Sequence, residues 1–301
     1  MLRAIDGHVH LYPPEVNRDP AGWAAAQGER HWAVLSTRRR SSRPVQGFPG
    51  PADLITAMDE AEVERAVLLG WYWERPASCA RQNRFYAECL RLHPDRFSAF
   101  ATFHPAAGAA AVTGELRRAR DEGFCGVGEL SPHAQGYPCE DPVLGQALAL
   151  AAEWRWPVNL HVADPEARPY PGCVATPLED FPALARRHPG VAFILAHWGG
   201  LLPLRLPEVK LPCNIHYDSA ASPLLYPPDI WPRMVAAVGA DRVIFGSDFP
   251  LNLYPRADLE PNLARFLAEA RGALAGPAQE PVLRGNLAAL VKSPAGLDRY
   301  I

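Results

Sequence analysis

The chain has 301 residues, of which 48% are hydrophobic and 21% are charged, proportions typical of a folded globular protein and not of a disordered or fibrous chain. Lys and Arg together number 30 against 33 Asp and Glu, a net charge of −3, so no overall positive field exists to attract nucleic acid or anionic lipid. We therefore expect neither nucleic acid nor a membrane as a partner.

The N-terminal segment and the cysteines indicate the compartment. The chain begins MLRAIDGHVH, which reaches polar residues before any apolar stretch long enough for a signal peptide, and no run approaches about 18 apolar residues. The 6 cysteines are scattered without a C-x-x-C pair, which predicts reduced, mostly buried thiols instead of a disulfide framework or a structural zinc knot. These features predict a cytoplasmic protein.

Short apolar runs alternate with segments of helical periodicity along the chain, the pattern of βα units around a parallel sheet. The expected strands are residues 2–7, 65–69, 97–103, 125–130, 157–162, 192–196, 213–217 and 242–246. The expected helices are residues 52–61, 82–92, 109–122, 142–153, 181–187 and 232–238. The pattern predicts an α/β protein, a (β/α)8 TIM barrel, as one domain over residues 1–301.

One long excursion, at about residues 11–50, follows the first expected strand and is expected to be a loop on the catalytic face of the barrel. Pro is abundant, at 32 residues or about twice the average usage, which suggests many ordered loops. The excursion carries the basic stretch from Arg38 to Arg43, which could bind a carboxylate or phosphate of a substrate. A charge run is more often a solvated loop, so we assign it no ligand.

His8 and His10 lie two residues apart at the end of the first apolar run, where strand alternation points both imidazoles the same way into the barrel mouth. An H-x-H pair arises easily by chance, so context decides its meaning. That context comes from His161 and His197, which end the fifth and sixth runs. Imidazoles gathered at strand ends are typical of a metal site.

Two carboxylates end other strands. Asp248 ends the eighth run, where it could hold a metal and accept a proton from metal-bound water. Glu129 ends the fourth run, where it could bridge a second metal or orient a ligand, although a capping or salt-bridge role is equally compatible with the sequence.

The remaining histidines and a group of aromatic residues have weaker placements. His104 and His133 follow the third and fourth strands, and Trp71, Tyr72 and Trp73 end the second, where they could wall a substrate pocket, although a core role is favoured for Trp71. The histidines without comparable placement are His31, His93, His188 and His216, of which His93 and His188 are expected to be helix-capping or surface residues.

The assembled motifs resemble the amidohydrolase superfamily, and within it the branch of aminocarboxymuconate semialdehyde decarboxylase and related metal-dependent hydrolases. They are, in chain order, IDGHVHLYP, MDEAEVERAVLLG, HPDRFSAFATFHP, LAHWGG, FGSDFP and RGNLAALV, and they span nearly the whole chain.

The resemblance implies that His8, His10, His161 and Asp248 bind a divalent metal, usually zinc, with manganese or iron as alternatives. It also implies that His197 polarises the substrate or assists proton transfer. Glu129 leaves open whether one or two metals are bound, since related proteins with Glu at the strand-four position can hold two. A homodimer is a further expectation from the family.

The resemblance and the residues together predict an enzyme acting on a small-molecule substrate. The first hypothesis is a hydrolase, in which the metal lowers the pKa of its bound water to roughly 7 so that the water can attack a carbonyl, ester, lactone or amide. Asp248 would then carry the proton and His197 would stabilise the developing charge. The second hypothesis is non-oxidative decarboxylation of an unsaturated or aromatic acid at the same metal. A third, a metal-binding scaffold without turnover, is disfavoured by the presence of His197 and Asp248.

Overall fold

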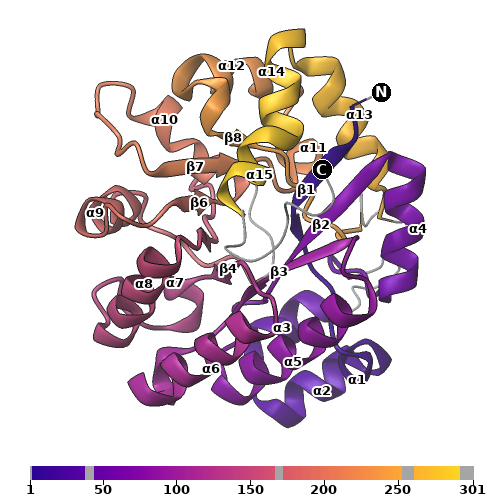
Figure 1. The fold of residues 1–301 in the computed structure, drawn as a ribbon, viewed down its shortest axis with the longest axis vertical. Helices are drawn as coiled ribbons and strands as arrows, with labels where there is room; N and C mark the ends of the chain where they lie inside the picture. Colours follow the sequence, from indigo (N-terminus) through magenta and orange to yellow (C-terminus); the bar gives the residue numbers. More distant parts are fainter. Residues whose placement is uncertain (1, 38–43, 167–171, 253–260, 292–301) are drawn as a thin grey trace.

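The computed structural model describes residues 2–37, 44–166, 172–252 and 261–291, and its strands form one sheet that curves around a central axis (Figure 1). The strands are β1 (Ala4–Val9), β2 (Val63–Leu69), β3 (Phe97–Ala101), β4 (Gly126–Leu130), β5 (Val158–Leu160), β6 (Phe193–Leu195), β7 (Ile215–Asp218) and β8 (Val243–Ile244). They pair in chain order from β1 to β8, and each neighbouring pair is parallel.

Backbone hydrogen bonds join the two edges of this sheet. The Gly7 N–H donates to the Phe245 carbonyl at 2.9 Å, and the His10 N–H donates to the Phe249 carbonyl at 2.8 Å. The segment that follows β8 thereby pairs with β1, so the sheet returns on itself. The predicted (β/α)8 barrel is confirmed, and all eight expected strands are present within two residues of their expected bounds.

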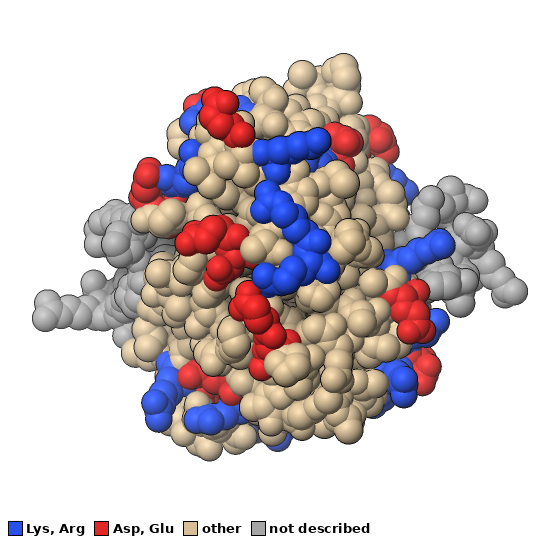
Figure 2. Space-filling model, turned by 90° about the vertical axis from the view of Figure 1, so that its left-hand side faces the viewer, with Lys and Arg blue, Asp and Glu red and all other residues tan. Residues whose placement is uncertain are grey.

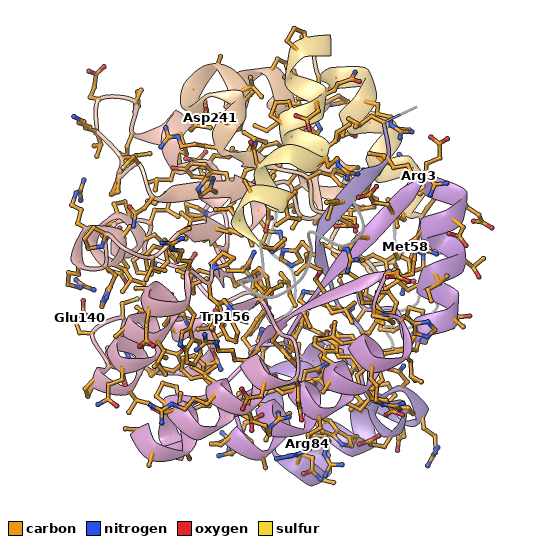
Figure 3. The ribbon with its side chains drawn as sticks, viewed as in Figure 1. Arg3, Met58, Arg84, Glu140, Trp156 and Asp241 are labelled. Atoms are coloured by element: carbon orange, nitrogen blue, oxygen red, sulfur yellow. The ribbon has the colours of Figure 1, made fainter. Side chains whose placement is uncertain are left out.

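Helices surround the sheet because each presents an apolar stripe to it. The longer ones are α4 (Pro51–Ala61), α5 (Pro76–Leu92), α6 (Ala109–Asp121), α8 (Pro142–Trp154), α9 (Asp180–Arg187), α12 (Ile230–Val238) and α13 (Leu263–Ala273). Met58 on α4 is fully buried, whereas the side chain of Arg84 on α5 is 62% exposed and points away from the barrel (Figure 3). The helical periodicity of the sequence reflects this division.

Short helical segments fill the connections. They are η1 (Pro105–Ala107), α7 (Pro132–Gln135), η2 (His197–Leu201), α10 (Leu202–Arg205), α11 (Ser222–Leu225), η3 (Ala240–Arg242), α14 (Gly276–Glu280), η5 (Pro281–Gly285) and α15 (Asn286–Leu290). Of these, α15 lies across one end of the barrel (Figure 1). Leu287 and Val291 pack there with Ile5, Phe100 and Ile244 in the barrel interior. This apolar plug closes the N-terminal ends of the strands and leaves the opposite end for polar chemistry.

The excursion after β1 is not the loop expected from the sequence. It contains α1 (Pro14–Arg18), α2 (Pro20–Gln27) and α3 (Arg30–Ser36). The prolines that suggested loops occupy the first positions of α1 and α2, where a missing N–H costs nothing. Asp19 caps α2 by accepting a hydrogen bond from the Gly22 N–H at 3.1 Å. The basic stretch at 38–43 lies outside the described residues.

The excursion is anchored to the loop that follows β2. The buried carboxylate of Glu29 accepts hydrogen bonds from the backbone N–H groups of Glu74 at 2.8 Å and Arg75 at 3.1 Å. Glu74 in turn accepts from the His31 N–H at 2.8 Å. These bonds fix α3 beside the aromatic residues that end β2.

The distribution of surface charges and the burial of the cysteines can be compared with what the composition predicts. On the face shown in Figure 2, Lys and Arg side chains are interspersed with Asp and Glu, with a short row of basic side chains near its centre. All six cysteines are free, four of them buried and two exposed. The expectation that most of the thiols are buried is therefore confirmed. Within the described ranges, no helix combines the length and the apolar character needed to cross a membrane.

Candidate metal centre

Irregular strand geometry aims the polar side chains into the barrel. The register between β1 and β2 shifts between Asp6 and Val9, and the register between β4 and β5 shifts between Val127 and Leu130. Such irregularities re-aim side chains and are frequent beside active sites. The first brackets His8, and the second brackets Glu129.

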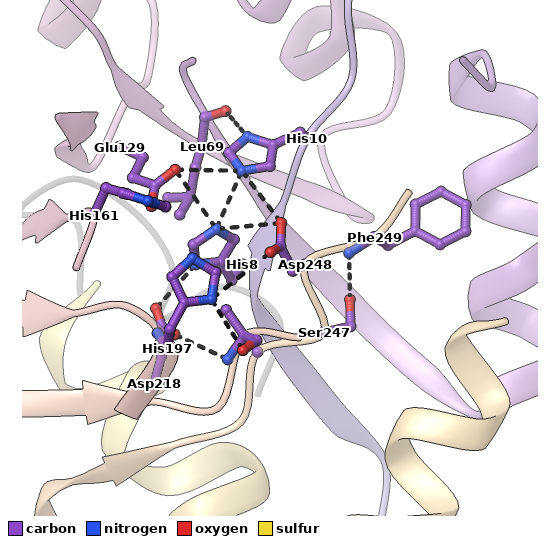
Figure 4. A network of polar contacts seen from close by, with 12 residues as sticks. His8, His10, Leu69, Glu129, His161, His197, Asp218, Ser247, Asp248 and Phe249 are labelled. Carbon is purple, nitrogen blue, oxygen red and sulfur yellow. Dashed lines mark hydrogen bonds and ion pairs between the residues drawn. The ribbon is translucent and has the colours of Figure 1, made fainter. Parts of the chain in front are cut away.

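His8 and His10 face each other through their Nε2 atoms, which lie 3.1 Å apart (Figure 4). The Nδ1 of His10 donates to the Leu69 carbonyl at 3.0 Å, and the Nδ1 of His8 donates to the Asp218 carboxylate at 3.0 Å. In their neutral forms both rings therefore carry the lone pair on Nε2. Two lone pairs aimed at one point require a positive charge between them, which a proton or a metal ion can supply.

Two carboxylates add to this demand for positive charge. An oxygen of Glu129 lies 3.5 Å from His10 Nε2 and 3.9 Å from His8 Nε2, and an oxygen of Asp248 lies 3.6 and 3.7 Å from the same atoms. Burial alone would lower the pKa of His8, but the nearby carboxylates of Asp218 and Glu129 raise it to about 10. The pocket thus strongly favours a cation, and this donor set fits a divalent metal.

His161 and His197 complete the cluster. His161 Nδ1 lies 2.9 Å from an oxygen of Glu129, and one ligand atom each from Glu129, His161 and His197 lie within 4.8 Å of one another. His197 Nδ1 donates to the Ala220 carbonyl at 3.1 Å and lies 3.8 Å from an oxygen of Asp248. Burial lowers the pKa of His197, so its ring is held neutral.

A left-handed turn places His197. The φ angles of the residues from His197 to Leu201 all lie between 54° and 61°, a region that favours glycine. Gly199 and Gly200 supply two of these positions, and a Cβ on Gly199 would lie 2.9 Å from the ring of Tyr217. The turn reverses the chain directly after β6 and brings the imidazole over the barrel axis.

A protein-family model described as Amidohydrolase matches residues 5–292 of the chain. The chain belongs to the amidohydrolase family. The match covers nearly the whole barrel, including each strand-end residue of the candidate metal centre.

Solved structures share the fold of this amidohydrolase. A 5-carboxyvanillate decarboxylase from Sphingomonas paucimobilis has a TM-score of 0.71 and 16% identity, with 97% of this chain and 100% of that chain covered. A dihydroxybenzoic acid decarboxylase from a Polaromonas species, with bound manganese, has a TM-score of 0.64 and 19% identity, with 100% of both chains covered. A candidate 2-pyrone-4,6-dicarboxylic acid hydrolase from Pseudomonas putida has a TM-score of 0.64 and 17% identity, with 97% and 98% covered.

Sequence reasoning missed the residues that hold the cluster of this amidohydrolase in place. Asp218, at the end of β7, accepts from His8 Nδ1, from the His197 N–H at 3.2 Å and from the Asn159 amide at 2.9 Å. Asp6 accepts from the His8 N–H at 3.1 Å and from the Ser247 N–H at 2.9 Å. Asp218 ends an apolar run just as Asp248 does, and that shared position is the signal that could have found it.

Other predicted positions divide between the centre and its surroundings. His104 lies apart from the cluster, with its Nε2 2.9 Å from the Gln135 carbonyl and its Nδ1 accepting from the Ala106 N–H at 3.1 Å. His93 and His188 are the C-cap residues of α5 and α9, as expected. Trp71 and Tyr72 border the cluster, with ring centroids 5.2 Å from His10 and 4.9 Å from His161 respectively.

Proposed function

We propose that this amidohydrolase is a divalent-metal-dependent, non-oxidative decarboxylase of a planar unsaturated or aromatic carboxylic acid. The observation that carries the metal requirement is the pair of Nε2 atoms of His8 and His10, 3.1 Å apart beside two carboxylates. His8, His10, His161 and Asp248 would hold the ion, with Glu129 as a further ligand or a bridge. A bound divalent cation would neutralise the carboxylates and polarise oxygen atoms of the substrate.

The aromatic border of the centre supports a planar substrate. The rings of Trp71 and Tyr72 stack at 4.3 Å with an interplanar angle of 22°, and each also borders a histidine of the cluster. Flat aromatic surfaces favour offset stacking with another planar group. The decarboxylases among the solved structures of the same fold act, by their names, on carboxylated phenols. We infer that decarboxylation explains this site better than the hydrolysis first expected from the sequence.

The chain's own residues provide a route for the required proton. Decarboxylation replaces a carbon–carboxylate bond with a carbon–hydrogen bond, so a proton must be delivered to carbon as carbon dioxide leaves. Asp248 and His197 are 7% and 9% exposed, lie side by side, and both border the metal position. We assign Asp248 to carry this proton and His197 to stabilise charge that develops on the substrate.

Hydrolysis is the second candidate. Its support is the fold shared with the candidate 2-pyrone-4,6-dicarboxylic acid hydrolase, together with the placement of Asp248 as a proton acceptor. Glu129, shared by two overlapping groups of candidate ligands, would suit a second metal in this reaction.

The deciding experiment compares products. Protein loaded with manganese or zinc is incubated with a panel of hydroxylated benzoates and with a matched panel of aryl esters and lactones. Release of carbon dioxide with the decarboxylated arene supports the proposal. Hydrolysis of the second panel without carbon dioxide from the first establishes the alternative, and activity on either panel that is unchanged after chelation contradicts both.

The matched variants are His197→Asn and His93→Asn. Loss of His197 should lower turnover by roughly 100-fold to 1000-fold while metal content is retained, because the residue acts on the substrate and is not a primary ligand. His93 caps α5 at the opposite end of the barrel, so its variant should keep full turnover. Equal turnover in the two variants would remove His197 from the mechanism.

A further inference from the structure

A second cluster of metal-binding residue types lies outside the candidate metal centre. It consists of His133 on α7, Cys139 in the connection to α8, and Asp180 at the first position of α9. One ligand atom from each lies within 4.8 Å of the other two, and His133 Nε2 is 2.9 Å from an oxygen of Asp180. Nothing in the proposed reaction uses these residues.

We propose that His133, Cys139 and Asp180 form a structural zinc site that fastens the segment following β4 to the start of α9. A sulfur, an imidazole nitrogen and a carboxylate oxygen are the three ligand types that zinc takes in proteins, and the sulfur and imidazole donors favour zinc over harder ions. Water would complete a four-coordinate shell. The site would secure the chain a few residues beyond Glu129 without taking part in catalysis.

Burial of the three residues fits an ion that enters from solvent. Cys139 is 7% exposed, whereas the side chains of His133 and Asp180 are 16% and 38% exposed. The ion therefore has an open side for entry and for a water ligand. His133 Nδ1 is buried and has no hydrogen-bond partner among the described residues, so one ring nitrogen of this histidine is left without a role in the metal-free protein.

Binding at this site exchanges a proton for a metal ion. The Cys139 sulfur would bind the ion as a thiolate, and its proton would pass to solvent when the sulfur–metal bond forms. The Asp180 carboxylate adds negative charge that favours a cation at the same place.

Cobalt(II) substitution separates this site from the candidate metal centre. The candidate groups at that centre contain only nitrogen and oxygen donors within the described part of the chain. A thiolate-to-cobalt charge-transfer band can therefore arise only from a cysteine-containing site. We expect the wild-type protein to bind about one equivalent of cobalt more than a His133→Gln, Cys139→Ser or Asp180→Asn variant, and to show the band.

The controls fix the assignment. The band should persist in Cys213→Ser, which replaces an exposed cysteine elsewhere, and in a His8→Ala/His10→Ala variant, which disrupts the candidate metal centre. It should vanish in Cys139→Ser and in His133→Gln, so that failure of one variant to fold leaves the other to decide. A wild-type protein without the band, or a band that survives both replacements or vanishes in Cys213→Ser, overturns the proposal. The proposed decarboxylation is unaffected by any of these results.

Discussion

Asp218 determines which nitrogen of His8 can bind a metal. Its carboxylate can only accept, so it holds the proton of His8 on Nδ1 and leaves the lone pair on Nε2. In Asp218→Asn the amide could donate to Nδ1 and stabilise the wrong tautomer. We expect metal affinity to fall by roughly 10-fold to 100-fold, as for other residues that orient a metal-bound histidine.

Competition with a chelator of known affinity measures this change. Asp241→Asn, which removes an exposed carboxylate shortly before β8, is the control and should keep wild-type affinity. Equal affinities in the two variants would mean that Asp218 does not act through His8.

His216 on β7 makes stability depend on pH. Burial and the positive charge of Arg242 lower its pKa from 6.5 to about 4. Between these values the unfolded chain binds a proton that the folded chain does not, so the free energy of unfolding falls as pH decreases through this window. The effect amounts to a few kcal/mol at most.

Denaturant titrations at pH 7 and pH 4 test this expectation. His216→Gln should lose less stability than the wild-type protein over that interval, because its side chain does not titrate. An equal loss in both proteins would show that His216 is protonated as readily in the folded state as in the unfolded state.

At the scale of elements, the left-handed turn after β6 joins fold and site. Gly199→Ala adds a Cβ 2.9 Å from Tyr217 at a φ of 59°. We expect a loss of ~1–3 kcal/mol in the free energy of unfolding, and lower turnover because His197 begins the same turn. Thermal unfolding and turnover at saturating metal measure the two effects.

Gly114→Ala is the matched control. Gly114 is exposed within α6, and a Cβ there would meet nothing within 4 Å. Alanine should therefore leave stability unchanged or raise it slightly, because it restricts the unfolded chain. If both alanine variants behave alike, the turn is not under the conformational constraint that its φ angles indicate.

The same elements show what the sequence could and could not predict. Strand ends were predictable because buried parallel strands read as short apolar runs and polar residues follow them. Strand alternation also predicted that His8 and His10 point the same way, whereas the role of Glu129 could not be chosen, because it lies at a register shift that breaks simple alternation. The helices of the excursion were missed because three short helices give little periodicity, and their stability comes from contacts such as Glu29 with the loop after β2.

At the scale of the whole molecule, the candidate metal centre connects the two ends of the barrel sequence. Its proposed ligands come from β1, from the end of β5 and from the segment after β8, and the sheet closes where β1 meets the segment after β8. A bound cation would therefore stabilise the closure itself, since metal that binds only the folded chain shifts the unfolding equilibrium. At a free metal concentration of 100 times the dissociation constant, this stabilisation amounts to about 2.7 kcal/mol.

We expect added manganese or zinc to raise the Tm of metal-free protein, and a His8→Ala/His10→Ala variant to lose most of the manganese response. Manganese is the sharper probe, because the sulfur-containing cluster at His133 should favour zinc. A manganese-induced rise in Tm that is as large in the double variant would place the ion elsewhere and remove the basis for metal-dependent catalysis at this site.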